Sequence, residues 1–429
     1  MSDDVPLSKS KRAKTAGLTM TKVAGKKLKL ACKRPFMSKQ KFENAQSQSD
    51  KEIASTIFEA ASSLRGAALK ILQFLSLEVD VLPDAYRKEF AKTHYKVPPL
   101  SRVIVRKTLQ DAFGKLPDEL FKAFDEVPFA AASLGQVHKA TTIVKGQEVA
   151  VKIKYPGIAK AVENDIRLAK QVILPFFKDT FIGSAIAEVE QRLEEELDYE
   201  KEFQTTQWFH DNIGGFGVAL PRPIKEFSSQ EVLTTTLQKG MHLAEWLAMN
   251  PRQAERNVAA QAMYDFFMRL LFKHGRIHAD PNPGNYLLHA DGRVGLVDFG
   301  CVKTFDPAFT ETIRQIFNAH IQNDDLRARE HYRLLGIDVD HEIYEKYVIP
   351  FGEWIALPFQ SRAFDFGANK DYCSQGVRIF RELLQQKAFG KFNVNVLFMN
   401  RNFYGLYRIF EMMKAQVVMT NEWIQPQTK

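Results

Sequence analysis

The chain has 429 residues, of which 45% are hydrophobic and 26% charged, and its formal net charge is +8. These fractions are typical of a soluble globular protein, and the length suffices for two or three domains or one large two-lobed domain. No apolar run reaches the roughly 18 residues of a membrane-spanning helix, no secretory signal is evident, and three cysteines without CxxC spacing exclude a disulfide framework or a thiolate zinc site.

The positive charge is concentrated at the N-terminus. Residues 1–41 contain twelve Lys or Arg and two acidic residues, so their net charge is +10, which leaves −2 for the rest of the chain. A Lys-rich segment with few large apolar residues is most simply a disordered tail. Contact with anionic lipid headgroups is the main alternative. A mitochondrial presequence would be richer in Arg, and nucleic-acid binding would favour interleaved aromatic residues.

The next part of the chain has helical periodicity. In residues 48–80, apolar side chains recur at steps of three and four, which predicts a helix. Residues 103–124 are predicted to form a short helical pair that is broken at Gly114 and Pro117.

The pattern then changes to strands and back to helices. Residues 128–155 alternate like strands, with a turn near Lys145-Gly146, and residues 231–237 predict a further strand. A long acidic helix is expected over residues 184–209. From His242 onward the chain is predicted to be mainly helical, except for a strand–turn–strand over residues 286–297.

The strongest chemical motif is His278-Ala-Asp-Pro-Asn-Pro-Gly-Asn285, followed by Gly295-Leu-Val-Asp-Phe-Gly300. Asp280 and Asn285 are five residues apart on a Pro/Gly-rich loop, and Asp298 follows a short apolar strand. Phosphoryl transfer needs a carboxylate that orients or deprotonates the acceptor, and oxygen ligands that hold Mg²⁺ on the phosphates. We therefore predict that Asp280 is catalytic, that Asn285 and Asp298 bind metal, and that Mg²⁺ with ATP or ADP is the cofactor.

A DFG sequence by itself is not specific. Phe364-Asp-Phe-Gly367 repeats it without a catalytic loop before it. The prediction therefore rests on the spacing of the whole set rather than on the tripeptide.

Lys152 ends the strand-like sequence VAVK and is the second element of the motif set. A strand lysine beside a nucleotide pairs with phosphates and with a helix glutamate, although an exposed strand lysine is the commoner case. A solvated face is the simpler interpretation of most acidic residues on the helix that follows. Helical spacing places Asp198 and Glu202 on one face of it. The same spacing pairs Glu196 with Glu200.

An alanine-rich segment stands where a glycine-rich loop would cover the phosphates. It reads Ala130-Ala131-Ala132-Ser133, and we assign it to nucleotide binding together with Lys152. Alanine carries a Cβ and resists positive φ, so this loop should be stiffer than one of glycines. An alanine-rich turn alone would carry no such meaning.

Together these motifs resemble those of the UbiB-like (AarF, coenzyme Q-linked) atypical protein kinases, a family linked to ubiquinone biosynthesis. The resemblance covers about residues 60–415. It includes the AAAS loop, the VAVK lysine, the ExD element Glu196-Leu-Asp198, Glu202 four residues past that aspartate, HxDPxPGN and DFG. The AAAS and ExD elements distinguish the family from small-molecule phosphotransferases.

The resemblance implies an α+β, protein-kinase-like fold of two lobes with an N-terminal helical extension over the active site. It implies roles for Lys152 and Glu202 as the nucleotide-lysine pair. The domains would be a basic, disordered tail (1–45), a helical extension (46–125), an N-lobe (126–238) and a C-lobe (239–425).

The family's KxGQ motif reads Lys70-Ile-Leu72-Gln73 in this chain. The resemblance implies that Lys70 contacts Glu196 and Asp198, and that Gln73 enters the cleft with it. Leu72 replaces the glycine that would permit close backbone approach. Either Lys70 and Gln73 enter differently, or the extension is simply repacked, because Leu72 also suits a helix.

The function predicted first is a Mg-nucleotide-dependent atypical kinase or ATPase that supports ubiquinone or related prenyl-lipid metabolism. The alternative is a nucleotide-binding scaffold without turnover at a membrane-associated biosynthetic complex. Retention of Asp280, Asn285 and Asp298 favours the enzyme, because a scaffold does not need all three. The partners implied are a nucleotide, an anionic membrane surface and quinone-biosynthesis proteins, without nucleic acid. We expect a cytoplasmic location with peripheral membrane contact, and leave a mitochondrial one open.

Overall fold

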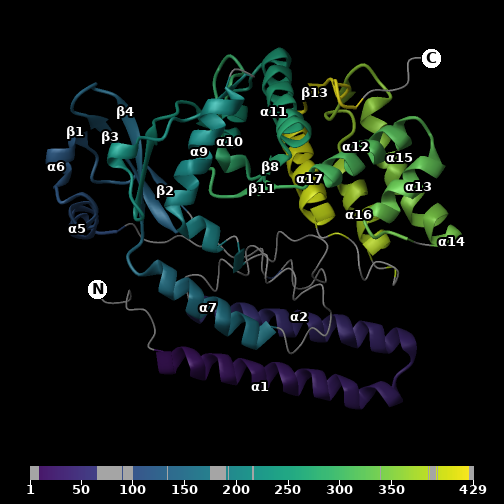
Figure 1. Cartoon of the computed structure of the whole chain (residues 1–429). Coiled ribbons are helices and arrows are strands. Elements are labelled where there is room, and N and C mark those ends of the chain that lie inside the picture. The colour runs from purple at the N-terminus through teal and green to yellow at the C-terminus, as the bar shows by residue number, and fades with distance from the viewer. Residues whose placement is uncertain are drawn as a thin grey trace. The chain divides into compact units, whose positions relative to one another are not determined.

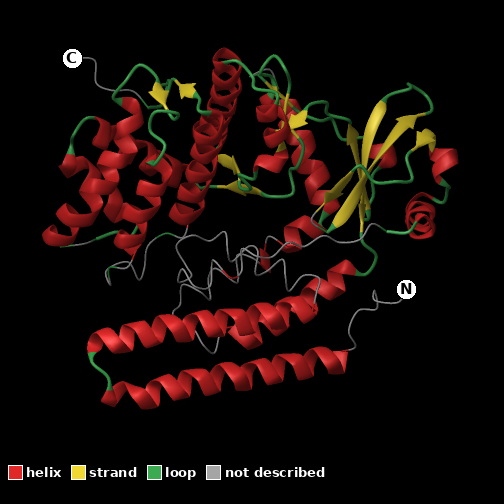
Figure 2. Ribbon diagram, turned by 180° about the vertical axis from the view of Figure 1, so that it is seen from behind, coloured by secondary structure: helices red, strands yellow, loops and turns green. Residues whose placement is uncertain are grey.

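The computed structural model describes residues 9–64, 89, 100–132, 134–173, 190–191, 193–214, 217–338, 340–384, 386, 393 and 395–424 (Figures 1 and 2). These residues belong to two compact units. The first unit is Met1–Pro117, Asp125–His138 and Lys152–Asp198, and the second is Asp118–Phe124, Lys139–Val151 and Tyr199–Lys429.

The N-terminal basic segment forms a helix, where the sequence predicted disorder. Helix α1 (Lys9–Lys33) and helix α2 (Lys39–Leu64) are joined by the 3-10 turn η1 (Arg34–Phe36) and run side by side (Figure 1). Val23 and Ile53 are almost completely buried. Because packing against α2 supplies stability that composition does not reveal, a Lys-rich stretch without proline becomes a helix. The predicted helix over 48–80 is confirmed as far as Leu64.

Helix α5 (Arg102–Phe113) ends as predicted at Gly114, which adopts the left-handed conformation (φ 69°). Helix α6 (Pro117–Leu120) follows it. The predicted helix over the last four residues of this region is wrong, because they form strand β1 (Phe121–Phe124). Strand β1 pairs antiparallel with the end of β3, so tertiary pairing overrides local preference here.

The larger sheet has the order β1-β3-β4-β6, and β2 also pairs with β3. The predicted strands over 128–155 and 231–237 are confirmed, with a turn at Gly146 (φ 59°). Alternate residues of β4, such as Val149 and Val151, are fully buried. The remaining strands are β2 (Ala130–Ala132), β3 (Gly135–Thr142), β4 (Glu148–Lys154) and β6 (Val232–Thr236).

The predicted acidic helix is interrupted. Residues 193–197 are helical, but Asp198 is not, and helix α9 (Tyr199–Ile213) begins directly after it. Aspartate is favoured immediately before the first helical residue, where its carboxylate meets free backbone N–H groups. Residues 184–189 lie outside the described residues. Helix α7 (Ile158–Ile173) precedes this region, and its Lys170 forms an ion pair with Glu190.

The second unit contains a small mixed sheet and a long central helix, α11 (Gln253–His274). The predicted strand–turn–strand over 286–297 is confirmed, with Val294 opposite Leu288. The other elements up to this point are β5 (Val218–Ala219), η3 (Lys225–Phe227), β7 (Met241–His242), α10 (Leu243–Ala248), β8 (Arg276–His278), η4 (Pro283–Asn285), β9 (Tyr286–Leu288) and β10 (Val294–Leu296), and the sheet order is β5-β10-β9-β7.

Helices complete the second unit around an aromatic core. Trp354 stacks on Tyr372 at 4.8 Å between ring centroids. The elements are β11 (Val302–Thr304), α12 (Pro307–Ile321), α13 (Asp325–Leu334), α14 (His341–Ile343), the π-helix η5 (Tyr344–Val348), α15 (Ile349–Ala356), η6 (Leu357–Phe359), β12 (Phe364–Asp365), α16 (Tyr372–Leu384), α17 (Asn395–Met413) and β13 (Gln416–Val417).

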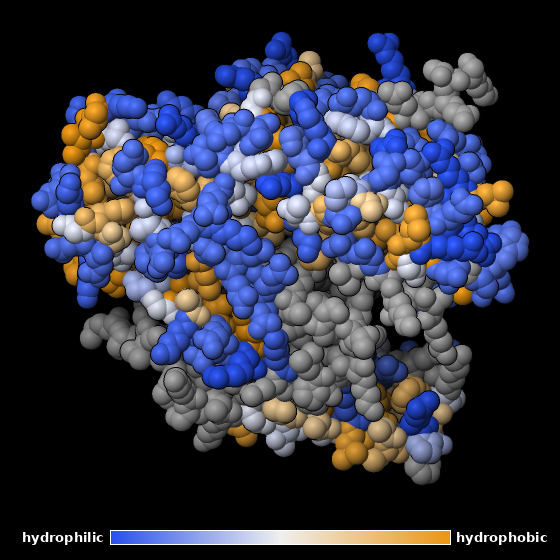
Figure 3. All heavy atoms as spheres, in the orientation of Figure 1, coloured by the Kyte–Doolittle hydropathy of each residue, from blue (hydrophilic) through white to orange (hydrophobic). Residues whose placement is uncertain are grey.

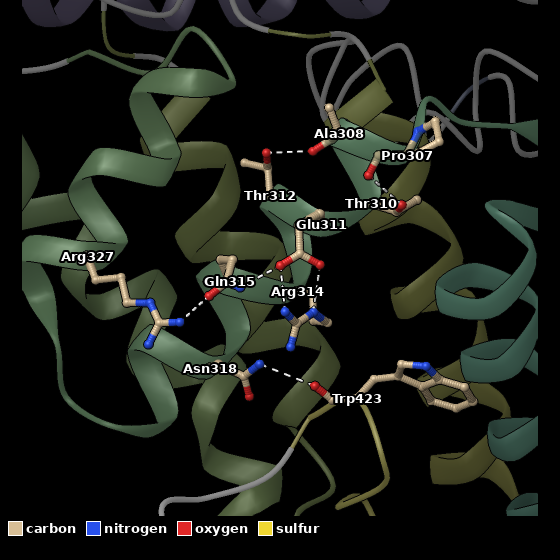
Figure 4. Close-up of polar contacts among 10 residues, drawn as sticks. All are labelled: Pro307, Ala308, Thr310, Glu311, Thr312, Arg314, Gln315, Asn318, Arg327 and Trp423. Atoms are coloured by element: carbon tan, nitrogen blue, oxygen red, sulfur yellow. Dashed lines mark hydrogen bonds and ion pairs between the residues drawn. The ribbon is translucent and has the colours of Figure 1, made fainter.

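The polar side of α12 ties together segments that are distant in the sequence (Figure 4). Gln315 accepts a hydrogen bond from Arg327 of α13, and Asn318 donates one to the Trp423 carbonyl at 3.2 Å. Glu311 accepts from Arg314, which lowers the pKa of the Glu311 carboxyl. Helix α12 is therefore fixed to both α13 and the C-terminal segment.

The surface shown in Figure 3 is mainly hydrophilic, with apolar residues in small groups. Within the part of the chain that the structure describes, no helix is long and apolar enough to cross a membrane.

Candidate functional site

Strand pairing in the second unit brings Asp280, Asn285 and Asp298 together. Strand β8 leads into the predicted catalytic loop, residues 278–285, which we call the catalytic loop below. The strand pairs antiparallel with β11, with His278 opposite Val302. The Val297 N–H donates to the Asn285 carbonyl at 3.1 Å. These pairings place the DFG segment beside both ends of the loop.

The side chains of Asp280 and Asn285 are in direct contact. The Asn285 Nδ2 donates to the Asp280 carbonyl at 3.2 Å and to its Oδ2 at 2.8 Å. Inside the loop, the Gly284 N–H donates to Asn282 Oδ1 at 2.9 Å and forms a tight turn. Because the Asn285 nitrogen faces Asp280, its Oδ1 is the atom that a cation would meet.

The backbone fixes the carboxylate of Asp298. Its Oδ1 accepts the Gly300 N–H at 2.9 Å, and its carbonyl lies 2.5 Å from the His278 Nε2. A Cβ built on Gly300 would lie 3.3 Å from Asp298 Oδ1 and 3.6 Å from Glu202 Oε2. The structure thus places Glu202 of α9 beside the DFG aspartate, and its side chain is only 3% exposed.

The donor set fits Mg²⁺. The Asn285 amide oxygen and the Asp298 carboxylate are hard oxygen ligands, which this cation prefers. Among the described residues, no group of three or more His, Cys, Asp or Glu is placed to hold a metal by itself. Mg²⁺ is usually bound through one or two protein oxygens together with substrate phosphates, and these residues match that arrangement.

A cluster of tilted and edge-to-face aromatic rings connects α9 with the loop, and sequence reasoning missed it. The Phe299 ring of DFG lies 4.8 Å from Phe209 and 6.1 Å from the His278 ring. Beside this aromatic cluster, the Arg276 guanidinium lies 3.9 Å from the centre of the Trp208 ring. The only signal in the sequence is the aromatic pair on α9, which periodicity alone assigns to the core.

Tyr286, directly after the catalytic loop, was also missed. It is buried, and burial raises the pKa of its hydroxyl, with a further increase from the nearby Asp280 carboxylate. Tyr286 therefore stays protonated beside Asp280 at neutral pH.

The second DFG sequence has a different role. Asp365 Oδ1 accepts the N–H groups of Gly367 and Ala368, at 2.8 and 2.9 Å, and its Oδ2 accepts from Gln416 Nε2 at 2.9 Å. The Gln416 hydrogen bond and these N–H groups lower the pKa of Asp365. Its carboxylate is used in a structural turn, so this motif does not form a second site.

The alanine-rich segment is a strand of a hairpin rather than an open loop. Ala130 pairs with Val137 and Ala131 with Gln136 in the β2–β3 ladder. The Tyr155 N–H donates to the Leu134 carbonyl at 3.1 Å, which anchors the tip of the hairpin. Ser133 and the side chains of Ala131 and Ala132 lie outside the description, so their contact with a nucleotide stays a prediction.

A buried polar network supports this hairpin. Gln136 is 1% exposed, and its Nε2 lies 2.7 Å from His138 Nε2 while its Oε1 accepts the Leu100 N–H at 2.7 Å. Burial lowers the pKa of His138. Sequence reasoning did not single out either side chain.

For the other predicted site residues, the structure does not test the predicted contacts. Lys152 is half-buried on β4 in the first unit, and its pairing with Glu202 stays a prediction. Glu196 is half-buried and Asp198 exposed. Lys70, Leu72 and Gln73 lie outside the described residues, so the proposed contact of the extension with Glu196 and Asp198 also stays a prediction.

The model of the ABC1 atypical kinase-like domain matches residues 92–332. Atypical kinase coq-8, mitochondrial, of Caenorhabditis elegans is 29% identical over 384 residues, which cover 85% of this chain and 49% of the relative. Atypical kinase COQ8B, mitochondrial, of Rattus norvegicus is 29% identical over 331 residues, 74% of this chain and 61% of the relative. The chain thus spans about half the length of the curated relatives it matches.

A solved structure shares the fold. Rv3197 of Mycobacterium tuberculosis, in complex with erythromycin, has a TM-score of 0.62 and 22% identity, and the match covers 90% of this chain and 98% of that one. At this identity the likeness concerns the fold alone.

Proposed function

Because this chain belongs to the ABC1 atypical kinase-like family, with COQ8 and AarF domain-containing kinases among its relatives, we propose that it is a Mg-nucleotide-dependent kinase or ATPase. The observation that carries the proposal is the cluster of Asp280, Asn285, Asp298 and Glu202 in one place. This is the set of oxygen groups that phosphoryl transfer needs.

Each residue has a role in the proposal. Asp280 orients the acceptor and takes its proton, and the Asn285 amide holds the Asp280 carboxylate in position. The Asn285 Oδ1 and the Asp298 carboxylate hold Mg²⁺, which neutralises charge on the phosphates when bound. Lys152 pairs with Glu202 and with the phosphates. The alanine-rich segment Ala130, Ala131, Ala132 and Ser133 covers the phosphates.

The length of the segment after DFG indicates which class of phosphoryl acceptor the site can take. Only residues 301–306 separate Gly300 from helix α12, and three of them form strand β11 against β8. In protein kinases a longer activation loop, ordered by phosphorylation, follows this point. A segment of six residues, three of them used in strand pairing, is too short to form such a loop, which favours water or a small or lipid acceptor over a docked polypeptide.

The biological role is proposed by relationship. Relatives named COQ8 support a role in ubiquinone or related prenyl-lipid metabolism, together with quinone-biosynthesis proteins. Two of these names include the word mitochondrial, so the proposal favours a mitochondrial location over the cytoplasmic one. Peripheral contact with an anionic membrane is supported by the lysines of α1.

The decisive experiment measures steady-state ATP hydrolysis by the full chain and by Asp298→Asn, together with quinone profiling of cells that lack the protein. We expect hydrolysis that Asp298→Asn abolishes, and a depleted quinone pool. Nucleotide binding without hydrolysis, combined with quinone loss, would instead support the scaffold function. An unchanged quinone pool would disprove the proposed pathway.

A further inference from the structure

Helix α17, near the C-terminus, packs so closely against the catalytic loop that there is no room for a side chain at Gly405. A Cβ built on Gly405 would lie 2.3 Å from Pro281 Cβ and 2.5 Å from its Cγ. Carbon atoms that are not bonded do not approach this closely. Only glycine at position 405 therefore allows Pro281, the residue after Asp280, to lie where it does.

The glycine is there for space and not for backbone conformation. Gly405 lies inside a helix of 19 residues and is not among the glycines with positive φ. At such a position glycine costs about 0.5–1 kcal/mol relative to alanine. Glycine at this position therefore makes the helix less stable but allows the catalytic loop to pack against it.

A second contact extends this face of α17. Lys303, on β11, lies with its Nζ 4.7 Å from the Phe398 ring. Phe398 and Gly405 are seven residues apart, which is close to two helical turns, so they share one face. Through Gly405 and Phe398 the helix contacts both the catalytic loop and the strand after DFG.

The other side of α17 is fixed to the core of the second unit. Phe403 is 4% exposed, and its ring lies 4.9 Å from Phe267 of α11 and 5.3 Å from Phe317 of α12. The helix cannot easily move away from the loop, so a larger residue at position 405 must displace Pro281. The proline ring is locked to its own backbone and cannot rotate aside.

From this geometry we propose that Gly405 is a positioning residue, which sets the place of Asp280 through its contact with Pro281. The inference rests on the proposed function and deepens it. Displacing Pro281 moves the adjacent Asp280 relative to Asn285, whose amide holds the Asp280 carboxylate at 2.8 Å. A shift of about 1 Å at a reacting group can reduce turnover roughly 100-fold.

The first readout is catalytic. We expect Gly405→Ala to lower kcat for ATP hydrolysis about 10- to 100-fold, while the Kd for Mg-ADP changes less than about three-fold. Adding Pro281→Ala should restore part of the lost rate, because it removes the ring that clashes. Gly25→Ala on α1, where a Cβ meets nothing within 4 Å, is the matched control and should leave kcat unchanged.

The second readout does not depend on turnover. Gly405→Ala should speed hydrogen exchange of the Ala279 and Asn285 N–H groups, which are bonded to Cys301 and Asn282 carbonyls, and the double variant should slow it again. If wild type hydrolyses no ATP, the proposed function fails, but the exchange result still decides the role of Gly405. The inference would be overturned if Gly405→Ala left both the hydrogen-exchange rates and kcat unchanged. It would also be overturned if the double variant recovered neither of them.

Discussion

Asp298 and Asp365 form the same local turn but lie in different surroundings. Each Oδ1 accepts the N–H of the glycine two residues later, at 2.9 Å for Asp298 and 2.8 Å for Asp365. The Oδ2 of Asp365 accepts from Gln416, whereas Asp298 lies beside Glu202 and the catalytic loop. Two DFG sequences in one chain therefore provide a test substitution and its matched control.

Asp298→Asn should abolish the Mg-dependent part of the thermal shift caused by ATP or ADP, with the fold intact. A ligand that binds only the native state raises Tm by mass action, and the carboxylate is proposed as a ligand of the metal. Differential scanning fluorimetry with and without Mg²⁺ measures it. Asp365→Asn should lower Tm without nucleotide and keep the full Mg-dependent shift. A wild-type shift in Asp298→Asn would show that the metal assignment is wrong.

Ala131→Gly, or Ala130→Gly, should change the ratio of ATP to ADP affinity more than it changes stability. Glycine relaxes φ and lets backbone N–H groups close around the terminal phosphate, at a cost of about 0.5–1 kcal/mol in a strand. Phosphate incorporation into the protein itself should also rise from near zero. Titration of both nucleotides checks the ratio.

The control for that experiment is Ala123→Gly, the same substitution on strand β1 of the same sheet. This variant should lower the free energy of unfolding by a similar amount and leave the ratio of ATP to ADP affinity unchanged. If the variants at 130 and 131 behave like this control, the β2 strand does not cover the phosphates.

Replacing Lys22, Lys29 and Lys33 by Gln should weaken binding to anionic vesicles. These lysines are exposed on α1, and each contributes on the order of 1 kcal/mol near an anionic surface, screened by salt. Co-sedimentation at two salt concentrations measures the effect. This triple variant is sharper than deletion of residues 1–41, which would also expose the buried Ile53 of α2.

The matched control replaces three exposed lysines elsewhere in the chain by Gln, namely Lys107, Lys115 and Lys145. The total charge is then the same in both variants. Equal loss of binding in the two would mean that net charge, and not α1, is what the membrane attracts.

The stability of the protein should fall as the pH is lowered from about 6.5 to about 4, because of His320. Its ring is buried, with Nε2 3.0 Å from the Tyr332 hydroxyl, and burial lowers its pKa to about 4. In this window the unfolded chain binds a proton that the folded chain does not, so the free energy of unfolding decreases, by about 3 kcal/mol in total. Above the window this penalty is absent.

The measurement compares denaturant unfolding of wild type and His320→Gln across that pH range. The variant should be less stable at neutral pH, because its side chain packs less well against Gly352, and should show a shallower pH dependence. His341→Gln, at an exposed position, is the control. Identical slopes in wild type and His320→Gln would refute the assignment.

Much of the fold followed from local patterns. The break at Gly114 and the strands around Gly146 were predicted correctly, because left-handed glycines and period-two alternation are properties of a few neighbouring residues. The N-terminal basic helix and strand β1 were not, because each is stabilised by packing or pairing with another element rather than by its own composition. For α1 that element is α2, and for β1 it is the end of β3.

The sequence by itself was sufficient to predict the chemistry that we propose for this protein. The spacing of Asp280, Asn285 and Asp298 predicts a phosphoryl-transfer site, since that chemistry requires those groups in that order on a loop and after a strand. Only the tertiary structure decided how the site is held. The contact of Pro281 with Gly405 joins residues that are 124 positions apart, and a close approach of that kind depends on packing that local sequence does not encode.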